Sequence, residues 1–270
     1  MASIKKHLII KTESKIHDTL FPEDFPSRAD KIHYYPEIGS TMDRARELAR
    51  KGCPSFTVVI ADHQTKGRGR LTRTWISETG GLYFTLILRP DLPPSDAHLL
   101  NFACSLALAK TIRYMYNIPA GVKWPNDILV SRKKLAGMLS EMGLAKDRLD
   151  YVNIGIGINA NNPPPVINID TGIRAISLKQ LAGHPIERKE LLSAFLDRIE
   201  TLTARFDPEA VIREWKQYSV TLNTHVRIVT NNEITNGFAV DVDDTGALLL
   251  KQENGTLKKI IYGDCFPLLS

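Results

Sequence analysis

The sequence predicts an α+β protein: a mixed sheet flanked by helices, followed by a small SH3-like β-barrel. Residues 31–220 alternate amphipathic helical patterns with short β-branched runs, which predicts one helix-flanked sheet. Residues 221–270 change to short strands at regular spacing with DDTG and ENG turns, which is typical of a small barrel. Residues 1–30 mix charges and prolines without periodicity, and we expect them to form a loosely packed extension.

The first helix is expected in the segment GSTMDRARELARKG, residues 39–52. Ser40 and Asp43 have the spacing of a capping box, in which each side chain bonds the backbone N–H of the other residue. Apolar residues recur at helical spacing along one face of the segment. Gly52 follows the last of them and suits the end of a helix.

The next elements are two strands, a long helix and three further strands. Residues 56–64 and 80–90 are apolar, β-branched runs, which predicts buried strands. A helix is expected to begin near Ser95, and it is apolar enough to be largely buried. Three more β-branched runs, separated by turn residues, are expected to join the same sheet: residues 121–130, 133–144 and 150–161.

Two helices and the barrel strands complete the chain. The helices are expected at residues 187–206 and 207–219. The second has Asp207 as its N-cap and Pro208 at its first position, where proline removes no helical hydrogen bond. Four or five short strands are expected in the barrel, four of them at residues 224–230, 237–243, 247–252 and 257–263.

Composition excludes several classes of protein. No apolar run approaches the ~20 residues that span a bilayer, and the start MASIKKHLIIKTESK lacks the apolar region of a signal peptide, so we expect a cytoplasmic protein. Cys53, Cys104 and Cys265 are far apart, and no Cys-x-x-Cys or His-x-x-x-His pair occurs, so neither a disulfide framework nor a zinc site is expected. The net charge of +5 permits nucleic-acid binding and equally suits an enzyme for anionic substrates.

The segment HQTKGRGRLTRTW, residues 63–75, is the most cationic loop of the sequence. Its glycines let backbone N–H groups approach a ligand, and the guanidinium groups of Arg68, Arg70 and Arg73 suit carboxylate and phosphate. The loop lacks the P-loop pattern. With Lys66, these arginines make four like charges that lie close together and repel one another, so we expect the loop to be mobile without an anion. A solvated basic loop is an equally good interpretation of the composition alone.

Two further stretches combine lysines with turn residues. In KWPNDILV, Lys123 and the pair Asn126 and Asp127 flank a Trp-Pro, although an Asn-Asp pair is often only turn chemistry. In KKLAGMLSE, Lys134 begins a strand, and Gly137 leaves room for a ligand against the backbone. A lone lysine is more often a surface lysine, so neither stretch identifies a function by itself.

Taken together, the motifs GRGRLTRTW, KWPND, KKLAGMLSE and GIGIN, in this order and spacing, resemble those of the biotin protein ligase family. The STMD helix entry and Gln64 fit the same pattern. The resemblance covers about residues 31–265 and implies a class II synthetase-like catalytic domain at 31–220 with an SH3-like domain at 221–270. It is specific because the motifs occur in combination.

The resemblance implies a two-step acyl transfer. Biotin's carboxylate attacks the α-phosphate of ATP to give biotinyl-5′-AMP, with Mg²⁺ sharing the charge, and a lysine amine on a biotin carboxyl carrier domain then displaces AMP. The positive loop agrees with this chemistry, since a carboxylate brought to a polyphosphate requires preorganised cations. Dimerisation is common in the family, and an exposed sheet edge is a plausible docking site for the carrier domain.

The resemblance also assigns roles to residues. Biotin is expected to contact Ser40, Thr41, Gln64, Gly67, Arg68, Lys134, Gly137 and Gly155. The nucleotide is expected to contact Arg70, Arg73, Trp75, Lys123, Asn126 and Asn159. Lys134 and Arg70 are expected to act in catalysis, with Lys134 on the carboxylate and the bridging oxygen of the adenylate. Asp127 is expected to bind the metal.

Two departures from the family pattern accompany these expectations. Leu71 stands where some members carry another arginine, which predicts weaker retention of the adenylate. Residues 1–30 are too short for the N-terminal DNA-binding domain of the bifunctional repressor members, so we expect a ligase that does not bind an operator.

Two other functions have to be weighed. A lipoate–protein ligase shares the fold and the adenylation chemistry, but the Gly-Arg-Gly-Arg loop belongs to the biotin enzymes, and polar side chains at the head site would penalise a dithiolane. A nucleic-acid-binding protein could use the loop as a basic patch, although the loop lacks interleaved aromatic residues for base stacking.

Overall fold

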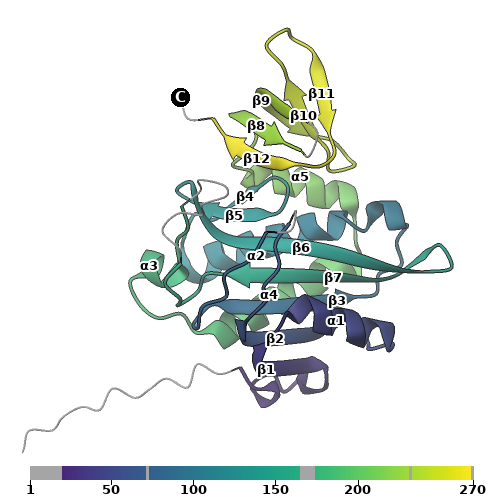
Figure 1. The fold of residues 1–270 in the computed structure, drawn as a ribbon, viewed down its shortest axis with the longest axis vertical. Helices are drawn as coiled ribbons and strands as arrows, with labels where there is room; N and C mark the ends of the chain where they lie inside the picture. Colours follow the sequence, from purple (N-terminus) through teal and green to yellow (C-terminus); the bar gives the residue numbers. More distant parts are fainter. Residues whose placement is uncertain (1–19, 71–72, 165–173, 231–232, 269–270) are drawn as a thin grey trace, which may run out of the picture.

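The structure is a computed structural model that describes residues 20–70, 73–164, 174–230 and 233–268. A seven-stranded sheet forms its centre, with strand order β1-β2-β3-β7-β6-β5-β4, and a five-stranded antiparallel sheet with order β11-β10-β9-β8-β12 lies at one end (Figure 1). In the large sheet, β1 and β2 are parallel, and the other neighbours are antiparallel. The predicted mixed sheet, flanking helices and separate C-terminal β-sheet are therefore confirmed.

The bounds of the elements are as follows. The strands of the large sheet are β1 Ile32–Ile38, β2 Thr57–Gln64, β3 Leu82–Leu88, β4 Gly121–Lys123, β5 Asp127–Val130, β6 Lys133–Ala145 and β7 Arg148–Ile158. The α-helices are α1 Thr41–Arg50, α2 Leu99–Tyr116, α3 Leu178–Ala182, α4 Arg188–Ala204 and α5 Pro208–Tyr218. The strands of the small sheet are β8 His225–Val229, β9 Ile234–Val242, β10 Leu248–Lys251, β11 Leu257–Ile260 and β12 Asp264–Pro267.

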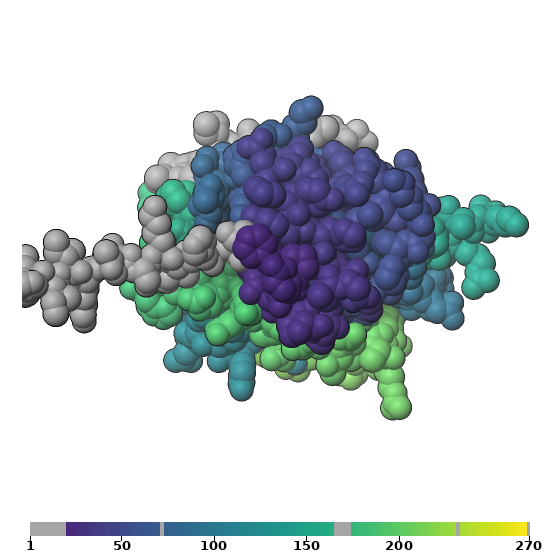
Figure 2. Space-filling model, turned by 90° about the horizontal axis from the view of Figure 1, so that it is seen from below, coloured from purple at the N-terminus to yellow at the C-terminus, as the bar shows by residue number. Residues whose placement is uncertain are grey.

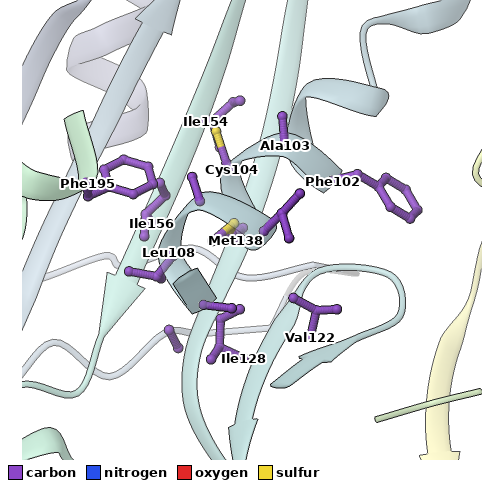
Figure 3. Packing of buried hydrophobic residues seen from close by; sticks show 14 of the residues in the cluster. Phe102, Ala103, Cys104, Leu108, Val122, Ile128, Met138, Ile154, Ile156 and Phe195 are labelled. Atoms are coloured by element: carbon purple, nitrogen blue, oxygen red, sulfur yellow. The ribbon is translucent and has the colours of Figure 1, made fainter. Parts of the chain in front are cut away.

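The core lies on one face of the large sheet, where α2 packs against the sheet and against α4. Alternate residues of a strand point to opposite faces, and Ile154 and Ile156 of β7 point toward this helical layer. Figure 3 shows them beside Cys104 and Leu108 of α2, with Phe195 of α4 closing the cluster. Burial of these apolar side chains stabilises the sheet that carries the site on its other face.

The opposite face of the sheet is covered only in part, by α1. Ala45 and Ala49 of this helix pack on Val59, Ile87 and Tyr151. Beyond the N-terminal end of α1 the sheet face is open to a cleft. In the view from below, the elements near the start of the chain form one end of the molecule, and the hairpin of β6 and β7 projects past its side (Figure 2).

Three local expectations about elements need correction. The long helix begins at Leu99 rather than near Ser95, because Pro93 and Pro94 favour a single 3₁₀ turn over Pro94–Asp96 before it. Strand β1 was not expected, since Pro36 interrupts its pattern, but it lies at the sheet edge where proline is tolerated. The short helix α3 was not expected either, although its Ser177 and Gln180 form a capping box.

Two expectations about helix ends are confirmed. Asp207 caps α5 by accepting from the backbone N–H of Ala210, and Pro208 is its first residue. Gly52 follows the end of α1 with a φ of +81°, a conformation that glycine adopts at least cost. In the described part of the chain, no helix combines the length and apolarity needed to cross a bilayer.

Candidate active site

A cleft opens on the sheet face beside the N-terminal end of α1, between the arginine loop, strands β5 to β7 and strand β12 of the small sheet. Most residues that the sequence singled out line it: Thr41, Gln64, Arg68, Arg70, Arg73, Trp75, Lys123, Asn126, Asp127, Lys134, Gly137, Gly155 and Asn159. Ser40 and Gly67 are buried and do not line the cleft. The fold thus brings together motifs from five separate segments.

One end of the cleft is a neutral, hydrogen-bonded wall. Gln64 at the end of β2 accepts from the backbone N–H of Thr41 at 2.9 Å and from its hydroxyl at 3.1 Å. Thr41 in turn accepts from the hydroxyl of Thr85 at 2.9 Å, and the Gln64 amide donates to the hydroxyl of Ser77 at 3.0 Å. The amide and hydroxyl groups at this end are therefore fixed in direction.

Ser40 adds a polar group without a partner. Its hydroxyl oxygen is buried and has no hydrogen bond among the described residues. The capping box expected for Ser40 and Asp43 is wrong, because the Ser40 side chain does not cap α1. A buried hydroxyl without a partner costs free energy, which a polar ligand can recover.

Glycines form the floor of the cleft. A Cβ on Gly157 would lie 2.4 Å from the indole of Trp75, and one on Gly155 would lie 2.7 Å from the sulfur of Met42. A Cβ on Gly137 would meet both Trp75 and Lys134 at 3.0 Å. The indole therefore rests directly on the backbone of β6 and β7, an approach that only glycine permits. Its Nε1 is buried and unpartnered within the described structure.

The centre of the cleft holds a buried carboxylate between two lysines. Asp127 pairs with Lys123 at 2.9 Å and with Lys134 at 2.7 Å. Burial would raise the pKa of the Asp127 carboxyl, but the two ammonium groups outweigh burial and hold that pKa well below its usual range. The Lys134 ammonium also lies 5.4 Å from the centre of the Trp75 ring, a cation–π distance. Asp127 and the Trp75 ring thus fix Lys134 at the middle of the cleft.

The arginines of the loop pair with carboxylates from outside it. Arg68 reaches Asp43 at 3.0 Å and Glu141 at 2.5 Å. Arg73 pairs closely with Asp264 of strand β12. These partners offset the mutual repulsion that led us to expect a mobile loop, and they hold Arg68 at the rim.

Arg70 lies deeper than the other loop arginines. Its guanidinium is 3.6 Å from Asp264 and 3.4 Å from the Asn126 side-chain oxygen. Burial lowers the pKa of Arg70, while the charges of Asp264 and Asp127 oppose that shift. Strand β12 therefore contributes a carboxylate that holds two arginines of the loop at one point of the cleft.

Asn126 and Asn159, which are expected to contact the nucleotide, have side chains directed at backbone carbonyl groups in this structure. The Asn126 amide donates to the carbonyl of Met138. The Asn159 amide is 3.4 Å from the carbonyl of Lys134, and its oxygen accepts from Asn162 at 3.1 Å. Both contacts help to place Lys134 and the strand after it. Their roles toward a nucleotide stay predictions.

The surroundings of Asp127 bear on its expected metal-binding role. Both oxygens of Asp127 accept from lysines, and the described residues contain no group of three or more His, Cys, Asp or Glu side chains that could hold a metal ion. These residues do not fit a metal bound by the protein alone. The expected metal-binding role of Asp127 stays a prediction that no contact supports.

Sequence reasoning missed three residues of the site: Ser77, Thr85 and Asp264. Ser77 lies in a loop and Thr85 within an apolar strand, and each matters through its contact with Gln64 or Thr41. Asp264 is 191 residues from Arg73 in the chain and belongs to the other sheet. A single polar residue in the buried run LYFTLIL was the one local signal available. Leu71 and most of the N-terminal extension lie outside the described residues.

Comparison with known proteins adds independent findings. Residues 34–159 match the biotin/lipoate A/B protein ligase family, and residues 221–266 match the biotin protein ligase C-terminal domain. The chain is 38% identical to the bifunctional ligase/repressor BirA of Bacillus subtilis, over 86% of this chain and 72% of that protein. It is 30% identical to the biotin–[acetyl-CoA-carboxylase] ligase of Paracoccus denitrificans, over 80% of this chain and 92% of that protein.

A solved structure shows the same architecture. The biotin protein ligase from Aquifex aeolicus in complex with biotin and ATP superposes with a TM-score of 0.74 at 30% identity, covering 89% of this chain and 99% of that one. Because the match covers 89% of this chain, it extends past the large sheet into the small one.

Proposed function

The chain belongs to the biotin protein ligase family, and from this premise we propose how its cleft works. The protein is an ATP-dependent biotin–protein ligase. It activates biotin with ATP to give biotinyl-5′-AMP and pyrophosphate, and it then transfers biotin to a lysine of a biotin carboxyl carrier domain. The observation that carries the assignment to this cleft is its polarity: a neutral hydrogen-bonding wall faces one end, and fixed cations face the other.

The neutral end suits the ureido head of biotin. A cyclic urea offers N–H donors beside a carbonyl acceptor, and Ser40, Thr41 and Gln64 offer matching groups. The unpartnered hydroxyl of Ser40 supports this placement, since a ligand would supply its missing hydrogen bond. The apolar valeryl tail would lie along the part of the cleft lined by Gly137, Gly155 and Leu139.

The cationic end suits the reacting carboxylate and the phosphates. Lys134 lies between the two ends, and its ammonium is held by Asp127 at 2.7 Å. We assign to it the stabilisation of charge on the carboxylate and on the bridging oxygen of the adenylate. Arg70 and Arg73 extend the positive surface toward the triphosphate, with Lys123 behind them. Trp75 supplies a flat surface for the adenine.

Two groups move into place when substrates bind. Arg68 points at the rim, so contact with the biotin carboxylate requires it to leave Asp43 and Glu141. Mg²⁺ would be brought in with the nucleotide substrate. It would screen the phosphate charges as the carboxylate approaches.

The acceptor domain is proposed to dock on the free edge of β6. Strand β5 pairs with the first part of β6 and Asn126 bonds Met138, so residues 139–145 present an edge without a described partner strand. This edge starts beside the cleft-lining Leu139, and Met142 and Leu144 are half-exposed along it. Addition of a strand there would bring an acceptor lysine close to the adenylate. We propose a cytoplasmic location, where ATP and carboxylases are available.

The two alternative functions are less well supported. The relatives and solved neighbours described above are biotin ligases, and a dithiolane would leave the buried Ser40 hydroxyl without a hydrogen-bond partner, which disfavours lipoate. The arginines of the loop are paired with carboxylates rather than displayed on an open basic face, which disfavours nucleic acid.

The test is exchange of pyrophosphate into ATP, measured with biotin, with lipoate and with neither acid. Wild type should show biotin-dependent exchange, and Lys134→Ala should slow it by about 10²- to 10³-fold, the cost of removing a preorganised charge. Lys133→Ala, which changes the neighbouring lysine of the same strand, is the matched control and should keep the wild-type rate. Lipoate-dependent exchange alone, or exchange with neither acid required, would overturn the assignment.

A further inference from the structure

The buried hydroxyl of Thr85 is unexpected from the strand that carries it. Strand β3 reads LYFTLIL, every residue of it is buried, and Thr85 is fully buried at its middle. Valine has nearly the same shape and avoids the cost of burying a hydroxyl. The hydroxyl is directed at the head end of the cleft, where it donates to Thr41 at 2.9 Å.

The hydrogen bonds at this end run in one direction. The backbone N–H of Thr41 can only donate, so the Gln64 atom 2.9 Å from it must be the amide oxygen. This contact fixes the amide orientation on chemical grounds. The Thr41 hydroxyl proton also goes to that oxygen, so the Thr41 oxygen is free to accept the proton of Thr85. The amide nitrogen then faces Ser77 and gives it one hydrogen.

The direction of this chain determines which groups remain for a ligand. The Thr41 hydroxyl donates its proton to Gln64, so toward a ligand it can only accept, through its remaining lone pair. The Gln64 amide donates one of its two hydrogens to Ser77, and the other hydrogen remains available to a ligand. An acceptor and a donor side by side complement the N–H and C=O of a cyclic urea. If the directions of these hydrogen bonds were reversed, donors of the site would face the urea N–H groups and acceptors would face its carbonyl.

We propose that Thr85 and Ser77 are positioning residues that set the donor and acceptor pattern of the biotin head site. Neither lines the cleft, so they act through Thr41 and Gln64. Thr85 saturates one lone pair of Thr41 and holds its hydroxyl toward Gln64. Ser77 holds the far side of the Gln64 amide, so that its remaining hydrogen points to the urea oxygen. This inference rests on the proposed function and adds the basis of its selectivity for a urea.

The test compares Michaelis constants in the pyrophosphate exchange assay. Thr85→Val and Ser77→Ala should each raise the KM for biotin roughly two- to tenfold, the range expected for one neutral hydrogen bond. The KM for ATP should stay at its wild-type value, because the nucleotide lies at the other end. Thr85→Ser restores the hydroxyl and should restore the KM for biotin.

Thr57→Val is the matched control. Thr57 is a buried threonine on the neighbouring strand whose hydroxyl donates to the carbonyl of Pro54 at 2.8 Å, away from the chain of hydrogen bonds. It should lower the melting temperature about as much as Thr85→Val and leave the KM for biotin unchanged. If biotin KM is unchanged in both Thr85→Val and Ser77→Ala, or rises equally in Thr57→Val, the proposal fails. If the wild-type protein shows no biotin-dependent exchange, the proposed function is overturned instead.

Discussion

The carboxylate of Asp264 offers the sharpest test of how the small sheet contributes to catalysis. It lies on strand β12, its side chain is 9% exposed, and it contacts both Arg70 and Arg73. Replacement by asparagine keeps the size of the side chain and removes its charge. The two guanidinium groups would then face each other without a common counter-ion. We expect the nucleotide end of the cleft to lose its organisation while the biotin end keeps it.

The magnitude follows from the distances. At an effective dielectric constant of about 20, an ion pair at 3.6 Å is worth roughly 4 to 5 kcal/mol before desolvation is counted. The side chains of Arg70 and Arg73 are 22% and 28% exposed, so water screens their attraction to Asp264. Asparagine also avoids the free-energy cost of burying the Asp264 carboxylate. A net loss of about 1 to 2 kcal/mol is therefore reasonable. Since about 1.4 kcal/mol corresponds to a factor of ten, the KM for ATP should rise about tenfold.

The assay is pyrophosphate exchange at varied ATP and saturating biotin, followed by the same series at varied biotin. Asp241→Asn is the matched control, because Asp241 belongs to the same sheet and pairs with Lys216 at 2.7 Å on the surface. It should change neither KM. The reasoning is refuted if Asp264→Asn leaves the KM for ATP within a factor of two of wild type, or if both variants raise it equally.

The remaining predictions concern the cleft floor and the thiols. Gly157→Ala places a methyl group 2.4 Å from the Trp75 indole and should lower kcat/KM for ATP by about 10²-fold with little change in melting temperature. The control is Gly39→Ala, which has open space around it and should resemble wild type. Equal kcat/KM values for the two variants would contradict the contact between the indole and the backbone of Gly157. Burial raises the pKa of the Cys265 thiol to about 11, so a thiol reagent at pH 8 should label the partly exposed Cys53 and spare Cys265 until the protein unfolds. Because the raised pKa belongs to the folded state, its contribution to stability is complete below about pH 9 and is lost as the pH rises toward 11, which alkaline denaturation curves would detect.

Patterns within one segment were sufficient to predict most of the fold. Strands β2, β3, β6 and β7 follow from apolar runs between turn residues, and α5 follows from its aspartate cap and first-turn proline. An error arises where a local pattern is not realised in the folded chain. Ser40 and Asp43 have capping-box spacing, yet the Ser40 side chain makes no capping bond, and the side chain that accepts from a backbone N–H at the start of α1 is Gln64, which bonds Thr41. That glutamine is 23 residues away, so the local pattern could not reveal it.

The arginine loop shows the same division between local and distant information. Its residue types predicted an anion site, and the cleft position of Arg68, Arg70 and Arg73 agrees with that prediction. The partners of these arginines could not be predicted, because Glu141 and Asp264 belong to elements that only the folded chain brings near. Such partners are chosen by geometry across the sheet rather than by spacing along the sequence.

These partners explain how a strongly cationic cleft can exist before its substrate arrives. Among the described lining residues, five cationic side chains face two carboxylates, a net charge of +3. Asp127 and Asp264 each hold two cations, so the carboxylates orient the positive groups without cancelling their total charge. A polyphosphate therefore meets cations that are already in place, and little of its binding energy is spent on ordering them. The cleft gains preorganisation from its acidic residues and attraction from the excess of basic ones.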